Sequence, residues 1–323
     1  MKYRQLGKTG FKVSEIGFGA WGIGGLSRGA TSYGRTDDNE SRVALRRAYE
    51  CGINFYDTSD IYGYGHSEVL ISEALRDVRN KIIIASKAGF LEHNGPYDFS
   101  PKHLRKALEM SLKRLQRDYL DLYQLHSPPI ELIESNDDIL SALKSLKKEG
   151  KIRAFGISLR SPDDGFIAIG RGFETIQINF NLLDQRALEN GLFAACGKAE
   201  TGVIIRTPLC FGFLTGRYSK GKPFSSSDHR STWSREQRER WATAYKLFLD
   251  IAGDKKKQSP AQIALRFCLS YKAVSSVIPG MLNKREVEEN ILASQLGPFS
   301  QKELSKIENI YRKNAFFLGK KEV

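Results

Sequence analysis

Residues 119–157, YLDLYQLHSPPIELIESNDDILSALKSLKKEGKIRAFGI, contain the pattern that decides the fold. A short apolar stretch, Tyr119–Leu125, is followed by an amphipathic stretch, Ser135–Lys148, which ends at Gly150, and then by a second apolar stretch, Ala154–Ile157. Short apolar stretches are typical of strands buried on both faces, and a glycine commonly ends a helix. The segment therefore predicts a strand, a helix and a second, parallel strand.

The same alternation continues through the chain in both directions. Further helical patterns are Asp38–Cys51, a helix that starts at Pro101, and Ser259–Leu269. The eight candidate strands are Glu15–Gly19, Asn54–Tyr56, Ile82–Ser86, Tyr119–Leu125, Ala154–Ile157, Thr175–Ile178, Val203–Arg206 and Val274–Ile278. Eight repeats without a run of hairpins predict parallel strands with right-handed crossovers. In 323 residues they fit a closed α/β (β/α)8 TIM barrel better than two doubly wound domains.

Two segments lie outside this repeat, although residues 1–323 are expected to form one barrel domain. Residues 1–13 predict a β-hairpin that plugs the bottom of the barrel. Residues 220–254 form an insertion after the seventh strand that carries Trp233 and Trp241. Because loops after the strands lie at the C-terminal rim, this insertion is a candidate lid. An inert insertion with a small helix of its own fits the sequence equally well.

The composition excludes several classes of protein. With 41% apolar residues the chain is not disordered, and no apolar run approaches the roughly 20 residues of a membrane span. Residues 1–5 lack the apolar stretch of a signal peptide. The cysteines, too scattered for a metal or redox pair, are Cys51, Cys196, Cys210 and Cys268. We expect a cytoplasmic protein with reduced thiols.

The charge is strongly basic, with 50 Lys and Arg against 37 Asp and Glu, a net of +13. Such a charge is compatible with nucleic acid, an anionic membrane or an acidic ligand. The basic residues are dispersed, and no basic cluster alternates with aromatic residues on a strand, as single-stranded nucleic-acid platforms do. We expect no nucleic-acid or membrane partner. Nothing in the sequence predicts an oligomeric state.

Four titratable side chains follow three neighbouring predicted strands. Asp57 and Tyr62 follow the second strand, Lys87 follows the third, and His126 follows the fourth. Because the C-terminal ends of parallel barrel strands converge on one pocket, these side chains are expected at one rim. Each alone has an ordinary interpretation, since Asp57 could cap a helix or bind a metal and His126 could be a buried structural residue.

Together the four suit proton delivery to a carbonyl oxygen. A tyrosine hydroxyl with a pKa near 10 is a weak acid. A neighbouring lysine ammonium stabilises the phenolate, and a histidine can orient a carbonyl. Nothing in the set supplies a reductant, so a cofactor would have to supply a hydride. The other histidines lie outside the strand ends, and no metal site is predicted.

The sequence resembles the aldo-keto reductase superfamily over essentially its whole length, in several stretches that occur in order and at family spacing. They are Gly52–Gly63 with Gly65–Glu68, Ser86-Lys87, Ser111–Leu115, Asp118–His126, Gly156–Ser158, Gln177 with Asn181-Leu182, Pro208-Leu209 with Gly212–Gly216, Ile278–Gly280 and Glu289-Asn290. The pattern is most similar to the bacterial reductases and the potassium-channel β-subunit branch.

This resemblance implies a barrel that binds NADP(H) and reduces an aldehyde or ketone, with sugar-like carbonyls among the candidates. Tyr62 would be the general acid, tuned by Lys87 and Asp57, and His126 would orient the carbonyl. The substrate pocket would be lined by Trp21, Tyr62, Phe90 and His126. The implied cofactor-binding residues are Gly19, Ala20, Trp21, Asp57, Ser158, Gln177, Arg206, Thr207, Pro208, Leu209, Arg217, Gly280, Met281, Asn283, Glu286, Glu289 and Asn290.

Departures from the family pattern concern the cofactor. Leu159 replaces a usual Asn or Arg, Leu282 stands at a position that often meets a 2′-phosphate, and Glu286 replaces a frequent Gln. A carboxylate would repel a 2′-phosphate, whereas Lys284 and Arg285 are close enough in sequence to offset it. We expect NADP(H), with NAD(H) as the alternative.

The alternative function is a nucleotide-sensing regulatory barrel like the channel β-subunits, in which turnover is incidental. That branch often has Asn in place of the histidine. Because His126 is present here, the sequence favours an enzyme.

Overall fold

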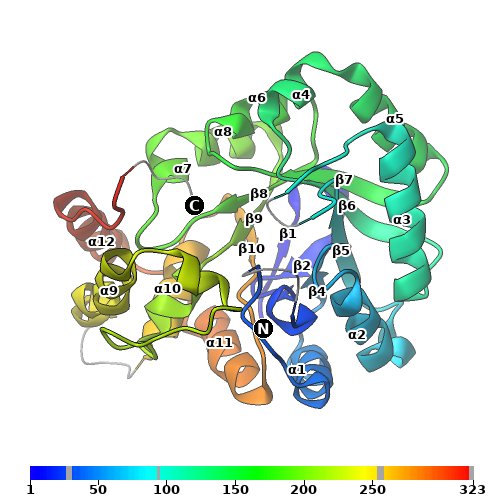
Figure 1. The fold of residues 1–323 in the computed structure, drawn as a ribbon. Helices are drawn as coiled ribbons and strands as arrows, with labels where there is room; N and C mark the ends of the chain where they lie inside the picture. Colours follow the sequence, from blue (N-terminus) through cyan, green and yellow to red (C-terminus); the bar gives the residue numbers. More distant parts are fainter. Residues whose placement is uncertain (27–30, 93–94, 253–257, 320–323) are drawn as a thin grey trace.

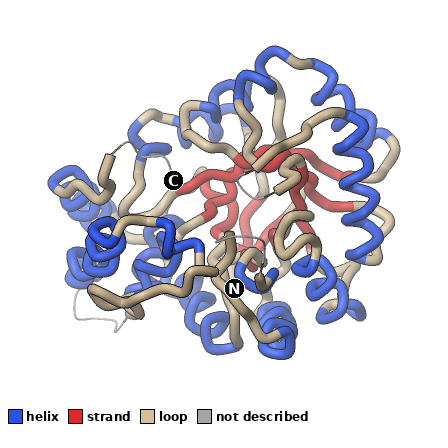
Figure 2. The backbone as a smooth tube through the Cα atoms, viewed as in Figure 1, coloured by secondary structure: helices blue, strands red, loops and turns tan. Residues whose placement is uncertain are grey.

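The protein is described by a computed structural model that covers residues 1–26, 31–92, 95–252 and 258–319. Eight parallel strands occupy the centre and helices surround them (Figures 1 and 2). The strands are β3 (Phe18–Gly19), β4 (Phe55–Asp57), β5 (Ile83–Ala88), β6 (Leu120–His126), β7 (Ile152–Ser158), β8 (Thr175–Asn179), β9 (Gly202–Arg206) and β10 (Val274–Val277). Each overlaps one predicted strand, so the predicted strand order is confirmed.

Backbone hydrogen bonds join the first and last of these strands. Val277 N donates to Glu15 O at 2.9 Å, and Gly17 N donates to Val277 O at 2.9 Å. A third bond runs from Gly19 N to Pro279 O at 3.0 Å. Because β3 and β10 are the two edges of the sheet, these bonds close it into the predicted (β/α)8 barrel.

Several helices begin at a residue whose side chain caps the first free N–H groups. Asp37 caps α1, Ser100 precedes Pro101 at the start of α3, and Ser259 makes a capping box with Gln262 in α10. The helices are α1 (Asp38–Glu50), α2 (His66–Ala74), α3 (Pro101–Leu115), α4 (Ile130–Ser135), α5 (Asp137–Lys148), α6 (Asp164–Gly170), α7 (Arg186–Glu189), α8 (Leu192–Ala199), α9 (Arg235–Ala244), α10 (Pro260–Leu269), α11 (Lys284–Leu296) and α12 (Gln301–Lys313). They bury their apolar faces against the outside of the sheet.

The predicted N-terminal hairpin is present. Strand β1 (Tyr3–Gln5) pairs antiparallel with β2 (Lys12–Ser14). Leu6 and Val13 are fully buried. They belong to an apolar cluster with residues of β4, β5, β6, β7 and β9 and with Ile278, which directly follows β10. Gly7 lies against the backbone of Gly202, the first residue of β9. The hairpin therefore closes the N-terminal end of the barrel, as predicted.

The predicted rim insertion is described except for residues 253 and 254, which lie outside the described ranges. It contains a short 3-10 turn (His229–Thr232), α9 and a second 3-10 segment (Tyr245–Ala252). The 228–229 backbone is joined to Ser32, whose carbonyl accepts from His229 N at 2.8 Å. The insertion is therefore fixed to the loop that follows β3, on the same rim as the strand ends.

Candidate active site

A cavity of about 1320 Å³ opens at the carboxyl ends of the strands. Pockets for small molecules commonly enclose about 300–1,000 Å³, so this one has room for more than a small carbonyl. The predicted site residues that line it are Gly19, Trp21, Asp57, Tyr62, Phe90, His126, Gln177, Arg206, Thr207, Pro208, Leu209, Arg217, Gly280, Glu286, Glu289 and Asn290. Those that lie outside its lining are Ala20, Lys87, Ser158, Met281 and Asn283.

Lys87 lies behind the cavity wall and links two residues of that wall. It is fully buried, and its Nζ donates to Asp57 Oδ1 at 2.5 Å, to Thr58 O at 2.9 Å and to Tyr62 Oη at 3.2 Å. A lysine ammonium has three protons, so these bonds use all of them. The arrangement fixes the ammonium directly beside the phenol.

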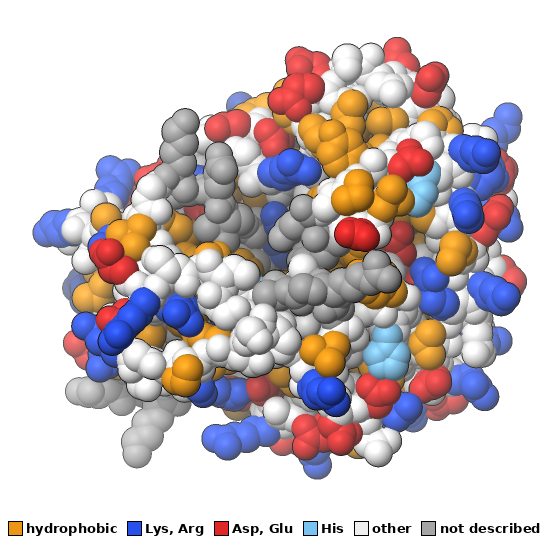
Figure 3. Space-filling view, viewed as in Figure 1, with side chains coloured by type: hydrophobic (Ala, Val, Ile, Leu, Met, Phe, Trp, Pro, Cys, Tyr) orange, Lys and Arg blue, Asp and Glu red, His pale blue; other side chains and the backbone are white. Residues whose placement is uncertain are grey.

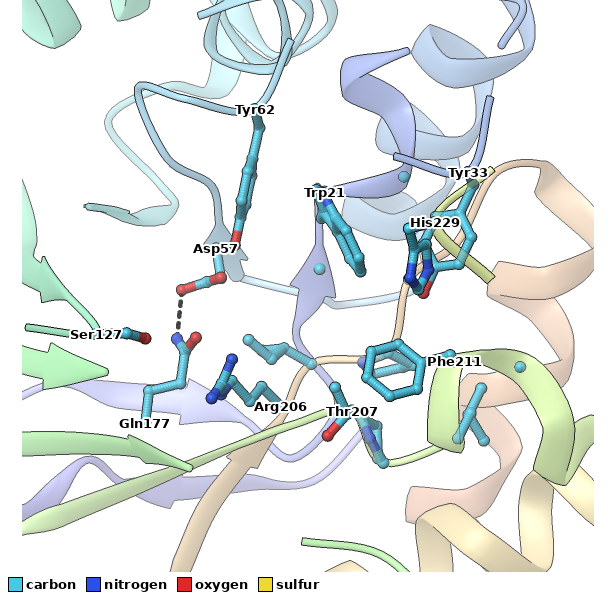
Figure 4. A pocket seen from close by; sticks show the side chains of 18 of the residues that line it. Trp21, Tyr33, Asp57, Tyr62, Ser127, Gln177, Arg206, Thr207, Phe211 and His229 are labelled. Atoms are coloured by element: carbon cyan, nitrogen blue, oxygen red, sulfur yellow. Dashed lines mark hydrogen bonds between the residues drawn. The ribbon is translucent and has the colours of Figure 1, made fainter. Parts of the chain in front are cut away.

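Two glutamines hold the second carboxylate oxygen of Asp57. Gln177 Nε2 donates to Asp57 Oδ2 at 2.7 Å, as Figure 4 shows, and Gln124 Nε2 donates to the same atom at 3.0 Å. Gln177 was predicted to bind nicotinamide, and in this structure its amide group orients Asp57. Gln124 was not predicted as a site residue, although it lies two residues before His126 and therefore on the same face of β6.

The pKa of Tyr62 is not lowered overall, although the sequence predicts that the neighbouring lysine lowers it. Burial raises its pKa, as does the charge of Asp57, whereas the Lys87 ammonium lowers it; the pKa of Tyr62 ends above its usual value. Burial also acts to lower the pKa of Lys87, but attraction to Asp57 and Tyr62 outweighs this and leaves that pKa raised. Lys87 therefore remains charged, and Tyr62 remains a protonated phenol at neutral pH.

His126 is oriented by a serine and two rings. Its Nδ1 lies 3.0 Å from Ser59 Oγ, and its ring meets Tyr62 and Phe90 edge-on, with centroids 5.7 and 5.2 Å apart. Ser59 Oγ has a single proton, which it can donate to His126 Nδ1 or to Asp60 Oδ1, 3.1 Å away; donation to Nδ1 leaves the ring proton of a neutral His126 on Nε2. Burial raises the pKa of Asp60 to about 7. This arrangement directs Nε2 away from Ser59, the geometry needed to contact a ligand beside Tyr62.

An aromatic wall that was not predicted from the sequence begins beside Tyr62, whose ring centroid lies 6.4 Å from that of Trp21. The Trp21 ring packs against Tyr33 and His229 at centroid distances of 4.9 and 4.7 Å, and Figure 4 shows these rings together with Phe211. Of the four residues Trp21, Tyr33, Phe211 and His229, the sequence predicted only Trp21 as part of the pocket. His229 reaches the wall from the rim insertion, about 200 residues away from Trp21 and Tyr33, so no local pattern could reveal it.

Arg230 holds this part of the insertion in place. Its guanidinium donates to both carboxylate oxygens of Asp228 and, at 2.5 Å, to Tyr218 Oη. The same group lies 4.7 and 4.6 Å from the ring centroids of Tyr33 and Phe224. Because Arg230 is almost completely buried, this packing fixes the neighbouring His229 against the cavity.

The two tryptophans of the insertion have different surroundings. Trp233 lines the cavity, and its ring packs against Phe211 at 4.6 Å. Trp241 is 1% exposed and lies behind it, with the two indole centroids 4.9 Å apart. Of the two, only Trp233 is therefore placed to touch a bound molecule.

The loop after β9 has a strained backbone. Thr207, Cys210 and Phe211 have φ angles of 51°, 45° and 55°, in the left-handed region that non-glycine residues rarely occupy. Thr207 and Phe211 line the cavity. Strain of this kind persists where the surroundings enforce it and is concentrated at binding sites. The loop is therefore a candidate ligand-binding segment.

At one end of the cavity an arginine connects this loop to α11. Arg217 donates through Nη1 to Glu286 and through Nη2 to Glu289 at 2.9 Å. Asn283 caps α11 by accepting from Glu286 N, and Met281 is fully buried. Neither Asn283 nor Met281 lines the cavity. Their predicted contacts with a cofactor are therefore absent from the lining of this cavity.

The residues present fit a nicotinamide dinucleotide. The cavity is larger than a small substrate needs and extends from Tyr62 to the first turns of α11, where Glu286, Glu289 and Asn290 line it. Arg206 Nε is buried and has no hydrogen-bond partner among the described residues. Ser158, predicted to bind the nicotinamide, is 1% exposed and accepts a hydrogen bond from Ser127 at 3.3 Å.

In residues 1–26, 31–92, 95–252 and 258–319, no group of three or more His, Cys, Asp or Glu side chains could hold a metal ion. Within these residues, none of the helices combines the length and apolar character needed to cross a bilayer.

Known proteins resemble this chain along nearly its whole length. The family model described as Aldo/keto reductase family matches residues 15–312. The L-glyceraldehyde 3-phosphate reductase of Escherichia coli K12 is 31% identical, over 95% of this chain and 92% of that protein. Two solved structures are similar: the glycerol dehydrogenase AKR11B4 from Gluconobacter oxydans (27% identity, TM-score 0.81, 98% and 97% coverage) and the holo form of the aldo-keto reductase AKR11C1 from Bacillus halodurans (28%, 0.79, 100% and 99%).

Proposed function

The chain belongs to the aldo/keto reductase family, and from this premise we propose that it reduces an aldehyde or ketone to an alcohol. The observation that carries this proposal is the Tyr62 hydroxyl, which lies in the cavity wall 3.2 Å from a fully buried lysine ammonium. Its ring meets His126, the residue that favours an enzyme over a sensing barrel. Substitution of Tyr62, argued in the Discussion, is the test.

The chain's own residues would handle the proton. The hydride for the carbonyl carbon would come from a reduced nicotinamide bound in the cavity. Tyr62 gives its hydroxyl proton to the carbonyl oxygen, and the phenolate that remains is stabilised by the Lys87 ammonium. Asp57 holds Lys87 in place, while His126 Nε2 orients the carbonyl beside the phenol. Solvent then restores the proton on Tyr62.

The walls of the cavity support a small polar carbonyl substrate. Trp21, Phe90 and Trp233 supply apolar faces, while His126 and His229 supply hydrogen-bonding groups. The relatives named above act, by their names, on a sugar phosphate and a polyol. We therefore propose sugar-like or polyol-derived aldehydes and ketones as the substrate class.

Substitution of Trp233 and Trp241, the two tryptophans of the rim insertion, should distinguish a residue that contacts substrate from one that only stabilises the fold. Trp233→Ala should raise KM for the best carbonyl several-fold, because Trp233 lines the cavity, and should destabilise the protein less than Trp241→Ala, because its ring is only partly buried. Trp241→Ala should lower the free energy of unfolding by about 3–5 kcal/mol, since it empties a fully buried indole site. Steady-state kinetics and thermal unfolding measure the two effects. An unchanged KM in Trp233→Ala would remove Trp233 from the substrate site.

The charges at the α11 end of the cavity favour NAD(H), the alternative in the sequence analysis, over NADP(H). Glu286 and Glu289 line the cavity together with Arg217. Lys284 and Arg285 lie outside its lining; Lys284 Nζ instead lies 3.9 Å from Glu288. A carboxylate can accept hydrogen bonds from a ribose diol, whereas it repels a 2′-phosphate. We therefore propose NAD(H) as the preferred cofactor.

Titration of intrinsic tryptophan fluorescence with NADH and NADPH tests this preference. The wild-type chain should bind NADH at least about tenfold more tightly than NADPH. Glu286→Gln should recover most of the NADPH affinity, because it removes one negative charge and leaves Arg217 paired with Glu289 alone. Glu288→Gln, a control on the same helix that is bonded to Arg47, should leave the ratio unchanged. Tighter NADPH binding by the wild type would refute the preference.

The distribution of charge on the surface supports a small-molecule substrate rather than a nucleic-acid partner. Basic and acidic side chains are intermixed over the face that Figure 3 shows, and many pair with each other, as Arg105 does with Glu149. The four cysteines are free thiols, which fits the cytoplasmic location we propose.

A further inference from the structure

The hydroxyl of Ser59 lies between the ring of His126 and the carboxyl group of Asp60. Ser59 Oγ is 3.0 Å from His126 Nδ1 and 3.1 Å from Asp60 Oδ1. The same oxygen accepts from Ile61 N at 3.4 Å, which uses one of its two lone pairs, and lies 3.1 Å from Lys87 O. The Lys87 carbonyl already accepts from Asp60 N at 3.1 Å. Ser59 therefore has one proton and one remaining lone pair to share between His126 and Asp60.

The direction of these hydrogen bonds decides which nitrogen of a neutral His126 carries the ring proton. When Ser59 donates to Nδ1, the ring proton lies on Nε2, and the Asp60 carboxyl group is then the donor to Ser59 Oγ. When Ser59 donates to an ionised Asp60, Nδ1 carries the ring proton instead, and Nε2 becomes an acceptor. Because Ser59 is fully buried, water does not replace either partner. The two ionisation states of Asp60 therefore correspond to opposite tautomers of His126.

Only one of these tautomers suits the reduction of a carbonyl. A carbonyl oxygen has no proton, so His126 can hold it beside Tyr62 only by donating from Nε2. We propose that Ser59 and Asp60 are positioning residues, and that Asp60 in its protonated form keeps this N–H on His126. Ionisation of Asp60 releases one proton to solvent, while the ring proton of His126 moves from Nε2 to Nδ1. This inference rests on the proposed carbonyl reduction, and it adds two residues to the four predicted from the sequence.

The surroundings of Asp60 agree with a change of ionisation near neutral pH. Burial and, more weakly, the charge of Glu68 on α2 raise the pKa of Asp60, whereas the Ser59 hydroxyl and Arg114 on α3 lower it; the result is a pKa of about 7. Arg114 is itself paired with Glu68 at 2.6 Å, so its charge is largely compensated. Tyr123 on β6 also faces Asp60, but burial raises its pKa well above the usual value, so it stays neutral in this range. Asp60 is therefore the group of this set that ionises near neutral pH.

The pH dependence of carbonyl reduction tests the proposal. As the pH rises through a midpoint near 7, kcat/KM should fall by about tenfold or more, because ionised Asp60 removes the N–H that holds the carbonyl oxygen. The pKa of Tyr62 lies above its usual value, so the loss of its proton gives a separate decrease at higher pH. Asp60→Asn cannot ionise and should lack the midpoint near 7. Ser59→Ala should lack it as well, because it breaks the link between the carboxyl group and the ring.

A second measurement on the full chain needs neither substrate nor turnover. In protein labelled with ¹⁵N at histidine, the His126 signals, assigned by their loss in His126→Asn, report the protonation of each ring nitrogen. We expect the ring proton on Nε2 at about pH 6 and on Nδ1 at about pH 8. Asp60→Asn and Ser59→Ala should abolish this change of tautomer.

Asp164→Asn is the matched control for both measurements. The Asp164 carboxyl group belongs to the same cavity, and burial raises its pKa as well. It accepts from Ser161 N at 3.1 Å and is not bonded to Ser59 in the described part of the chain. This variant should keep both the wild-type midpoint and the wild-type change of tautomer.

Three results would overturn the inference. If His126 keeps one tautomer between about pH 6 and about pH 8 in the wild type, Asp60 does not control it. Protons on both ring nitrogens above the midpoint would mean an imidazolium, which needs no such control. A midpoint that persists in Ser59→Ala would mean that Asp60 acts through its charge rather than through the hydroxyl. If the wild type reduces no carbonyl, the proposed function fails, and the NMR spectra still decide whether Ser59 and Asp60 set the tautomer of His126.

Discussion

Tyr62→Phe should lower kcat/KM for carbonyl reduction by about 10²- to 10⁴-fold, because it removes the group that gives the proton and leaves the hydride source untouched. The phenol makes one side-chain hydrogen bond, with Lys87, so the loss of its oxygen changes little else in the wall. The aromatic ring that meets His126 and Trp21 stays in place. Initial rates with the best carbonyl of a panel measure the effect.

Two controls accompany this substitution. The dissociation constant for the reduced nucleotide, measured by fluorescence, should stay within a few-fold of the wild-type value. Tyr64→Phe changes an exposed tyrosine two residues away and should leave the rate unchanged. Activity retained in Tyr62→Phe would show that another group delivers the proton.

Lys87→Met should both inactivate the protein and destabilise it. The substitution leaves Asp57 buried without its cationic partner, which typically costs about 3–5 kcal/mol of folding free energy. Activity should fall by at least about tenfold, because the phenol loses the ammonium 3.2 Å away. Chemical denaturation and initial rates measure the two losses.

The double variant Lys87→Met with Asp57→Asn separates these effects. Asparagine removes the buried charge while it can still accept hydrogen bonds from Gln124 and Gln177, so much of the stability should return. Activity should not return, since no cation lies against Tyr62 Oη. A double variant as unstable as Lys87→Met would mean that the unpaired charge is not the source of the destabilisation, and recovered activity would contradict the role of Lys87.

Most of the fold could be predicted because apolar stretches and caps are local properties. The eight strands and the helix starts at Pro101 and Pro260 all lie where the sequence pattern indicates. Strand boundaries differ at β3, which was predicted to start at Glu15 and is restricted to Phe18–Gly19. Glu15 and Gly17, which precede β3, form backbone hydrogen bonds with Val277 of β10, where the first and last strands of the barrel meet. A local sequence pattern cannot predict this distant partner.

The site was predictable only where strand ends alone determine it. Asp57, Tyr62 and His126 meet in one cavity because parallel strands converge, and Lys87 lies directly behind them. The aromatic wall with His229 depends on where a long insertion docks, which requires the tertiary structure. The sequence also predicted that Lys87 lowers the pKa of Tyr62. It could not predict the larger, opposite effect of burial, which depends on the tertiary structure.

The most direct test of the proposed reaction is the oxidation of reduced nicotinamide by the purified wild-type chain with a panel of aldoses, keto sugars, aromatic aldehydes and methylglyoxal. Loss of nicotinamide absorbance with NADH and with NADPH is followed beside Tyr62→Phe, and the alcohol product is quantified. We expect at least one carbonyl to yield one alcohol for each nucleotide oxidised, faster with NADH, and at a rate that nearly vanishes in the variant. Nucleotide that binds without any carbonyl being reduced, or equal rates in the two proteins, would contradict a carbonyl reductase that uses Tyr62 as its proton donor.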